Sequence, residues 1–446
     1  MKLVILGGGG FRVPLVYAAL LRDRMPGRVT QVALVDIDAR KLEVNRRVLA
    51  AQARTYSDAP TVSFHTDLAE ALPGADFVFS AMRVGGLQGR ADDERIGQSR
   101  GVIGQETVGF GGISYALRTL PTALEVARIV QQLAPQAWVI NFTNPAGIVT
   151  EAMSTVLGDR VIGICDSPIA LARRSLRSLG IAPERAEIQY AGLNHLGWLT
   201  GLIVDGTDVL PELLTRPDLL ATFEEGRLFG SEWLSTIGAI PNEYLHYYMY
   251  EREVLHADQL ELRSRGRYLQ EQVESYTRQA DEGTTDPLEL WERTRHDRES
   301  TYMAANRLSA GVGERDAEDL TSGGYENVAI ALMRGIAHDQ NARLVLNVRN
   351  RGALADLDDD AVVEVPCVVD ASGAHPLPGS KLLESGRGLV HAVKYVERQT
   401  IEAGLSGSRL AATRALAHHP LVDSVAVARG LLQDALDTFP QLEYLR

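Results

Sequence analysis

The sequence contains few cysteines, no long hydrophobic run and no excess of positive charge, and each absence excludes a class of protein. Two cysteines, Cys165 and Cys367, cannot form a disulfide framework, so we expect a cytoplasmic protein with reduced thiols. No apolar run approaches the roughly 18 residues of a membrane span, and the N-terminal apolar segment is too short for a secretory signal. Acidic residues number 58 against 45 basic ones, which argues against nucleic acid or an anionic membrane as a partner.

The apolar content is sufficient for a large folded core. The 446 residues are 45% apolar and 23% charged, as is typical of globular enzymes. The length exceeds that of one ordinary domain, so we expect either a large α/β unit with an appended domain or two interlocked domains.

The first 200 residues alternate between short apolar runs and segments of helical periodicity. Strands are predicted at residues 2–6, 31–35, 61–64, 76–81, 138–142, 161–164 and 188–191. Helices are predicted between them at residues 13–22, 39–53, 115–132 and 145–157. This alternation indicates an α/β fold with a Rossmann-type doubly wound parallel sheet, like that of lactate and malate dehydrogenases, with ligands at the carboxyl ends of the strands.

After about residue 207 the pattern becomes mainly helical. Helices are predicted at residues 231–250, 268–281, 288–307, 325–338, 383–401 and 421–439, and strands at 342–348 and 361–369. We therefore divide the chain into a Rossmann-type domain over residues 1–200 and a mainly helical α+β domain over residues 201–446.

The first predicted strand leads into a glycine-rich segment that favours a dinucleotide. Glycines there let the backbone approach a pyrophosphate at a helix N-terminus, although Arg12 stands where the usual pattern has its third glycine. Asp36 ends the second strand, at a spacing suited to a ribose contact, and its charge favours NAD over NADP. A glycine-rich turn of another α/β protein is the alternative. The residues expected to bind NAD here are Gly7, Gly9, Gly10, Phe11, Arg12 and Asp36.

Polar segments follow several of the predicted strands. Residues 81–112 combine many glycines with Arg83, Arg90, Arg95 and Arg100, which form either a solvated loop or a cradle for an anionic substrate. Residues 141–145 read Asn-Phe-Thr-Asn-Pro, in which Asn144 either meets nicotinamide or meets substrate. Their position at strand ends places both segments beside the expected ligand.

Cys165 and His195 each follow a predicted strand, on the side expected for the cofactor. A buried cysteine or histidine taken alone is usually structural, but a thiolate and an imidazole together can hold a divalent transition metal with open positions. Tyr244, Tyr247 and Tyr248 share one helical face after Pro241. Such a stripe is more often core, yet a phenol acts as a base when a cation lowers its pKa.

These segments together resemble glycoside hydrolase family four, the NAD- and manganese-dependent glycosidases, over nearly the whole chain. The segments are residues 83–87 (Arg-Val-Gly-Gly-Leu), 104–107 (Gly-Gln-Glu-Thr), 141–145, 165–168 (Cys-Asp-Ser-Pro), 192–195 (Gly-Leu-Asn-His), Pro241 with Tyr244, Asn347 with Asn350 and Gly352, and 363–366 (Val-Glu-Val-Pro). The family usually has Ser at Gly10 and Thr at Val13, but backbone groups do most of the nucleotide binding.

The resemblance implies a redox-neutral hydrolysis. NAD⁺ would accept hydride from C3 of the sugar, Tyr244 would remove the acidified C2 proton, and a metal on Cys165 and His195 would polarise the oxygens at C2 and C3. Asp166 would protonate the leaving oxygen or orient a metal-bound water. Water would then add at C1, and NADH would return the hydride. The first domain would bind NAD, and the second would bind substrate and form a homodimer or homotetramer.

The resemblance also implies a phosphorylated glucoside as substrate. Residues 83–87 look like the 6-phospho-β-glucosidases, which we favour, whereas Asp166 after the cysteine looks like the 6-phospho-α-glucosidases. The residues expected to bind substrate are Arg90, Glu106, Asn144, Asn194, Arg263 and Arg265, with the arginines and Asn144 around the phosphate. A net NAD-dependent sugar or hydroxy-acid dehydrogenase and a non-catalytic NAD-binding sensor are the alternatives.

Overall fold

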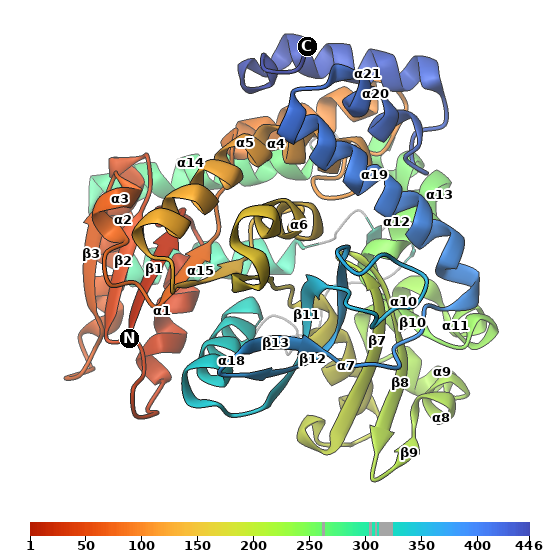
Figure 1. The fold of residues 1–446 in the computed structure, drawn as a ribbon, viewed down its shortest axis with the longest axis horizontal. Coiled ribbons are helices and arrows are strands. Elements are labelled where there is room, and N and C mark those ends of the chain that lie inside the picture. Colours follow the sequence, from red (N-terminus) through yellow and green to blue (C-terminus); the bar gives the residue numbers. More distant parts are fainter. Residues whose placement is uncertain (261–263, 303–305, 308–309, 312–323) are drawn as a thin grey trace.

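The computed structural model describes residues 1–260, 264–302, 306–307, 310–311 and 324–446. In these ranges, thirteen strands belong to one sheet, which runs through the middle of the molecule with helices on both faces (Figure 1). Within the same ranges, no helix is both long enough and apolar enough to cross a membrane.

The amino-terminal half of the sheet consists of six parallel strands in the order β3-β2-β1-β4-β5-β6. They are β1 (Lys2–Leu6), β2 (Gln31–Val35), β3 (Thr61–His65), β4 (Phe77–Ser80), β5 (Trp138–Asn141) and β6 (Val161–Gly163). This order is that of a dinucleotide-binding sheet, in which ligands bind where the strand order reverses, between β1 and β4. The predicted Rossmann-type fold is confirmed.

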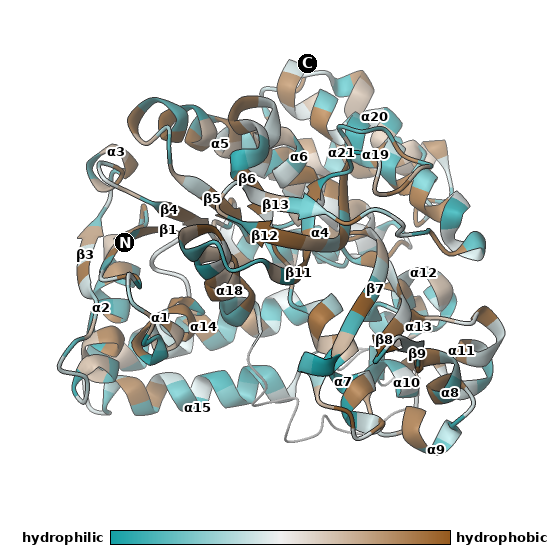
Figure 2. Ribbon diagram, turned by 60° about the horizontal axis from the view of Figure 1, so that its bottom comes forward, coloured by the Kyte–Doolittle hydropathy of each residue, from teal (hydrophilic) through white to brown (hydrophobic). Residues whose placement is uncertain are grey.

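Alternating side chains of the parallel strands face two helical layers. Leu3 and Ile5 of β1 belong to the core that contains α1 (Val13–Arg22) and α18 (Tyr325–His338). Val4 belongs to the opposite core, with α5 (Gly109–Leu133) and α6 (Ala146–Leu157). Both layers of helices are visible in Figure 2, where α18 is mainly brown and the outlying α15 (Pro287–Ser300) is mainly teal.

Antiparallel strands extend the sheet beyond β6. They are β11 (Ala342–Arg349), β12 (Val362–Asp370), β7 (Ala186–Leu193), β8 (Leu196–Val204) and β10 (Ile240–Pro241), with β9 (Thr207–Asp208) and β13 (Gly373–Pro376) paired to β8 and β12. The predicted boundary at residue 200 therefore falls inside β8, which the periodicity did not reveal as a strand. The division into two domains stays a prediction.

The remaining helices complete the layers on the sheet and the parts of the chain that flank it. In the first half they are α2 (Ala39–Ala53), α3 (Leu68–Ala71), α4 (Gly86–Ser99) and α7 (Ser167–Ser178). The later ones are α8 (Leu210–Leu214), α9 (Pro217–Leu220), α10 (Glu224–Phe229), α11 (Ser231–Ile237), α12 (His246–Met249), α13 (Glu251–Leu260), α14 (Arg265–Glu282), α19 (Arg387–Ser406), α20 (Arg409–Ala417) and α21 (Val425–Thr438). Short 3₁₀ turns are η1 (Gly158–Arg160), η2 (Pro183–Arg185), η3 (Glu243–Leu245), η4 (Glu384–Gly386) and η5 (Pro440–Leu442). Helix α14 packs on α4, and α15 packs on α2.

The predicted helix at residues 231–250 is wrong. Helix α11 ends at Gly238, whose φ of +68° is a left-handed conformation that favours glycine. The chain then forms β10 on the edge of β8, and the 3₁₀ turn η3 carries Tyr244. The tyrosines therefore belong to two short elements rather than to one helix.

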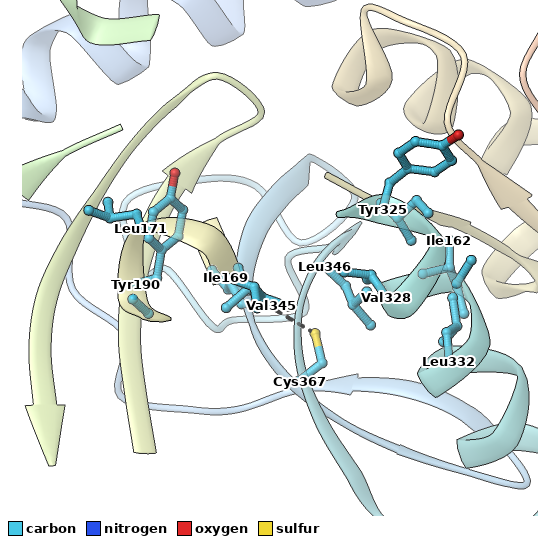
Figure 3. Close-up of a cluster of buried hydrophobic side chains, with 14 of the residues drawn as sticks. Ile162, Ile169, Leu171, Tyr190, Tyr325, Val328, Leu332, Val345, Leu346 and Cys367 are labelled. Atoms are coloured by element: carbon cyan, nitrogen blue, oxygen red, sulfur yellow. Dashed lines mark hydrogen bonds between the residues drawn. The ribbon is translucent and has the colours of Figure 1, made fainter. Parts of the chain in front are cut away.

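A buried apolar cluster joins the two halves of the sheet (Figure 3). Tyr325, Val328 and Leu332 of α18 lie beside Ile162 of β6 and Leu346 of β11.

The second cysteine belongs to the same cluster. Cys367 is fully buried, and its Sγ donates to the carbonyl oxygen of Val365 at 3.4 Å. It serves as a small hydrophobic residue.

Candidate active site

A cavity of about 1710 Å³ opens at the carboxyl ends of the parallel strands. The segments after β1, β2, β4, β5 and β6 form one wall, and residues of η3, α14 and α15 form the other. The predicted site residues that line it are Gly7, Gly9, Gly10, Phe11, Arg12, Asp36, Arg90, Glu106, Asn144, Cys165, Asp166, His195, Tyr244 and Arg265. Arg263 lies outside the described residues. The roles predicted for these residues stay predictions.

The end of the cavity that is predicted to hold the nucleotide is shaped by close backbone approach. Gly7 has a φ of +79°, and a Cβ there would lie 2.5 Å from the carbonyl oxygen of Ala81. The Asp36 carboxylate accepts from the backbone N–H of Gly9 at 2.9 Å, which fixes it beside the glycine turn. The Asn45 side-chain amide donates to the carbonyl oxygens of Gly8 and Gly10, at 2.8 and 3.0 Å. Asn45 therefore supports the turn, and the sequence pattern did not single it out.

Cys165 and His195 lie on the cavity wall and are each 5% exposed. Burial raises the pKa of the Cys165 thiol well above its ordinary value, and the negative charges of Glu364 and Asp166 add to this. Burial lowers the pKa of His195 to about 3, so its imidazole is neutral, as a metal ligand must be. Its Nδ1 lies 3.0 Å from the Thr107 hydroxyl.

This pair has the chemistry of a partial metal site. In the described ranges, no group of three or more His, Cys, Asp and Glu side chains is arranged to hold an ion. One thiolate and one imidazole suit a divalent transition metal, whose further ligands would be water or substrate oxygens. The donor set therefore fits a metal that is completed by its substrate.

Glu364 is a buried carboxyl group near Cys165 that sequence reasoning did not assign. It accepts hydrogen bonds from Asn347 Nδ2 at 2.9 Å, Asn194 Nδ2 at 3.2 Å and the Tyr190 hydroxyl at 3.2 Å. Burial raises its pKa to about 7. Asn194 therefore holds Glu364 and is not among the residues that line the cavity, so its predicted substrate contact gains no support.

Tyr244 is stacked on His195, the predicted metal ligand. Its ring lies parallel to that of His195, with centroids 3.6 Å apart and an interplanar angle of 5°. Its hydroxyl lies 3.0 Å from that of Tyr302. Burial raises the pKa of the phenol well above 10, and Tyr302 and Glu243 raise it further. Ionisation of Tyr244 would therefore require a bound cation nearby.

The other two tyrosines differ in position. Tyr247 lines the same cavity, with its ring centroid 6.3 Å from that of Tyr244. Tyr248 instead lines a separate apolar cavity of about 280 Å³ beside Trp198. The stacking on His195 therefore favours Tyr244 over Tyr247 and Tyr248 as the predicted base.

Glu106 joins two arginines in the cavity. Its carboxylate contacts Arg83 at 2.8 Å and Arg90 at 2.7 Å. Burial alone would raise its pKa, but the two guanidinium groups outweigh burial and lower the pKa to about 2. Arg90 also contacts Glu94 at 2.8 Å. Two carboxylates therefore already pair with Arg90, and Glu106 orients arginines rather than standing free for substrate.

Three further arginines line the cavity on the second wall, Arg265, Arg295 and Arg298. Arg265 of α14 donates to the Thr301 hydroxyl at 2.6 Å and to the Arg298 carbonyl oxygen at 2.9 Å. Burial and the charge of Arg90 lower its pKa to about 10. It therefore lies close to the cations of the first wall.

Arg298 of α15 is the most perturbed cation in the cavity. Its guanidinium lies 5.0 Å from the ring centroid of Phe11. Burial lowers its pKa to about 9, and four positive charges contribute, those of Arg12, Arg265, Arg90 and Arg83. In the described part of the chain, no carboxylate forms an ion pair with it. Crowded cations of this kind favour a bound anion.

Arg12 and Asp166 line the same cavity and interact electrostatically. Burial would lower the pKa of Arg12, but Glu299, Tyr325 and Asp166 outweigh burial and raise it. Asp166 lies beside Gly324, where a Cβ would come within 2.6 Å of its carboxylate oxygen. The positive charge of Arg12 therefore interacts with the carboxyl group of Asp166, which lies at the start of α7.

Comparison with known proteins gives one consistent family. The model described as "Family 4 glycosyl hydrolase" matches residues 2–181, and the model of its C-terminal domain matches residues 190–422. A relative named "Probable 6-phospho-beta-glucosidase" from Bacillus subtilis is 33% identical over 98% of this chain and 96% of its own. A "6-phospho-alpha-glucosidase" from Leptotrichia buccalis is 29% identical over 98% of this chain and 97% of its own.

Solved structures agree with these relatives. The 6-phospho-beta glucosidase from Thermotoga maritima, determined with manganese, NAD⁺ and glucose-6-phosphate, has a TM-score of 0.81 at 29% identity and covers 98% of both chains. Malate dehydrogenase from Plasmodium falciparum, at 12% identity and a TM-score of 0.52 over 91% of this chain and 99% of its own, shares the fold alone.

Proposed function

The chain belongs to family 4 of the glycosyl hydrolases, and we propose that it hydrolyses 6-phospho-β-glucosides with NAD⁺ and a divalent metal. The observation that carries the phosphorylated substrate is the position of Arg298, whose pKa is depressed by burial and by four neighbouring arginines in the cavity. A dianionic phosphate would relieve that repulsion. The β linkage is supported by the relatives of that name, at 33% and 31% identity.

The residues of the cavity fit both cofactors. When bound, NAD⁺ supplies a hydride acceptor for C3, and the metal supplies positive charge that polarises the oxygens at C2 and C3. The glycine turn and Asp36 would hold the nucleotide. Cys165 and His195 would hold the metal. Asn144, which follows β5, lines the same cavity.

Tyr244 is the base in this proposal. Its phenol is held by Tyr302, and its ring is fixed against His195, so the oxygen stays beside the metal pair. It removes the C2 proton once the neighbouring charge permits its ionisation. Asp166, which follows Cys165 and lines the same cavity, donates a proton to the leaving oxygen at C1.

The phosphate would bind at the arginine end of the cavity. Arg298 and Arg265 reach it from the second wall and Arg90 from the first, while Glu106 keeps Arg83 and Arg90 in place. Arg298 replaces Arg263 as the second-wall partner in this proposal.

A 6-phospho-α-glucosidase is the second candidate. Asp166 directly after Cys165 favours it, as does the relative of that name. The two anomeric nitrophenyl 6-phosphoglucosides, assayed with NAD⁺, Mn²⁺ and a reductant, separate the candidates. Faster turnover of the β-anomer supports the first candidate, and faster turnover of the α-anomer supports the second.

The same assay tests the reaction class. Unphosphorylated nitrophenyl glucosides should be poor substrates, and NADH should not accumulate with product because each cycle returns the hydride. Steady formation of one NADH per product would show a net dehydrogenase instead. We also propose a cytoplasmic homodimer or homotetramer, which analytical ultracentrifugation and cell fractionation would test.

A further inference from the structure

The neighbouring residues Glu106 and Thr107 contact two different parts of the site, and Gln105 precedes them in the chain. Glu106 pairs with the arginines, whereas Thr107 contacts His195. Gln105 joins them through its side-chain oxygen, which accepts from the backbone N–H groups of Thr107 and Val108 at 2.5 and 2.9 Å. Because two backbone donors point at this atom, it is the oxygen of the amide and not its nitrogen.

The Thr107 hydroxyl lies 2.9 Å from the same Gln105 oxygen. A hydroxyl has a single proton to donate, and an amide oxygen can only accept. The Thr107 proton is therefore directed to Gln105, and the hydroxyl oxygen presents a lone pair to His195. In this arrangement His195 Nδ1, which lies 3.0 Å from that oxygen, is the donor and carries a hydrogen.

We propose that Thr107 is a positioning residue that holds His195 in the Nδ1–H tautomer, so that Nε2 presents its lone pair to a divalent metal in the cavity. This inference rests on the metal role proposed for His195. Parallel stacking on Tyr244 holds the plane of the same ring. Such outer partners fix ring orientation and typically contribute about 10- to 100-fold in metal affinity.

Another buried histidine shows the opposite arrangement. His419 Nδ1 accepts from the backbone N–H of Leu421 at 3.0 Å, so its hydrogen is on Nε2. Burial alone therefore does not select the Nδ1–H tautomer, and the Thr107 contact accounts for it at His195.

The first test reads the tautomer directly in the metal-free protein. Long-range ¹H–¹⁵N spectra of protein labelled with ¹⁵N-histidine distinguish protonated from unprotonated ring nitrogens, with His419 as the internal reference for Nε2–H. We expect His195, identified by loss of its signals in His195→Gln, to carry its hydrogen on Nδ1. A hydrogen on Nε2 would overturn the inference, whatever the enzyme hydrolyses.

The second test measures Mn²⁺ affinity by electron paramagnetic resonance, without substrate. Thr107→Val keeps the shape and removes the hydroxyl, and it should weaken binding by about 10- to 100-fold. Thr107→Ser keeps the hydroxyl and should bind within about threefold of the parent, given the same retained hydrogen bond. Equal affinity of the valine variant and the parent would overturn the inference. Loss of binding in Cys165→Ser, with failure to hydrolyse any glucoside in the parent, would refute the proposed function and leave the metal-site inference standing.

Discussion

Replacing Arg298 by glutamine should stabilise the free protein and weaken binding of the phosphorylated substrate. The two effects have one cause, because the positive charges of Arg12, Arg265, Arg90 and Arg83 act on a guanidinium that no described carboxylate pairs with. Glutamine keeps a polar side chain of moderate length on α15 and removes the charge. A purely structural arginine would show the opposite effect on stability.

The magnitude follows from the lowered pKa of Arg298. The pKa falls from 12.5 to about 9, and each unit corresponds to about 1.4 kcal/mol, so the unscreened cost of the charge would be about 5 kcal/mol. The side chain keeps some contact with solvent, and the variant loses the packing on Phe11, so we expect a gain of about 1 kcal/mol in the free energy of unfolding. Loss of one charge-assisted contact to phosphate costs about 1.5 to 3 kcal/mol, or roughly 10- to 100-fold in KM.

Chemical denaturation and steady-state kinetics measure the two effects. Arg293→Gln is the matched control, because Arg293 is an exposed arginine on the same helix that contacts Gln279 at 3.1 Å. The control should change neither KM nor stability appreciably. If Arg298→Gln lowered stability and left KM for the phosphorylated glucoside unchanged, the assignment of the arginine end as the phosphate site would be wrong.

Three other changes test the remaining parts of the cavity, and a fourth tests a buried histidine outside its lining residues. Cys165→Ser should abolish turnover and Mn²⁺ binding while NAD⁺ binding persists, because a neutral hydroxyl is a weak metal ligand; full turnover by the parent enzyme in excess chelator would contradict this. Asp36→Ala should weaken NAD⁺ binding and reduce discrimination against NADP⁺, as fluorescence titration would show. Tyr244→Phe should slow solvent deuterium exchange at C2 together with turnover, and unchanged exchange would move the base to Tyr247. Burial lowers the pKa of His419 to about 3, so the unfolded chain binds a proton that the folded protein excludes. Unfolding free energy should therefore fall by about 2 kcal/mol more between pH 7 and pH 5 in the parent than in His419→Gln.

The amino-terminal elements could be predicted to the residue. The predicted ranges 2–6, 13–22, 31–35 and 39–53 coincide with β1, α1, β2 and α2. Their signals are local, because β1 and β2 are apolar on both faces and α2 begins at the Asp38 cap, which accepts from the backbone N–H groups of Arg40 and Lys41. Residues that follow such strands are carried to one edge of the sheet, so the cavity-lining set was largely accessible from sequence.

The elements and site residues that the sequence did not predict depend on contacts with distant parts of the chain. Strand β8 is stabilised by β7 and β10 rather than by its own periodicity, and the left-handed Gly238 interrupts a segment that otherwise reads as helix. Arg298 belongs to α15, a polar helix with several arginines, and only the folded chain shows that Arg295 and Arg298 line the cavity while Arg293 does not. Glu364 is embedded in an apolar strand, where a lone acid gives no indication of its partners Asn347 and Asn194.

The cavity has crowded cations at one end, and this charge can orient a phosphorylated sugar. Arg298 is influenced by four arginines, whereas Cys165 is influenced by the carboxyl groups of Glu364, Asp166 and Glu243. A substrate bound in reverse would leave the crowded arginines without a compensating anion. With the phosphate held by the arginines, the opposite side of the ring, which carries C1 to C3, lies toward Cys165, His195 and Tyr244. The charge pattern therefore selects the carbons at which the proposed chemistry occurs.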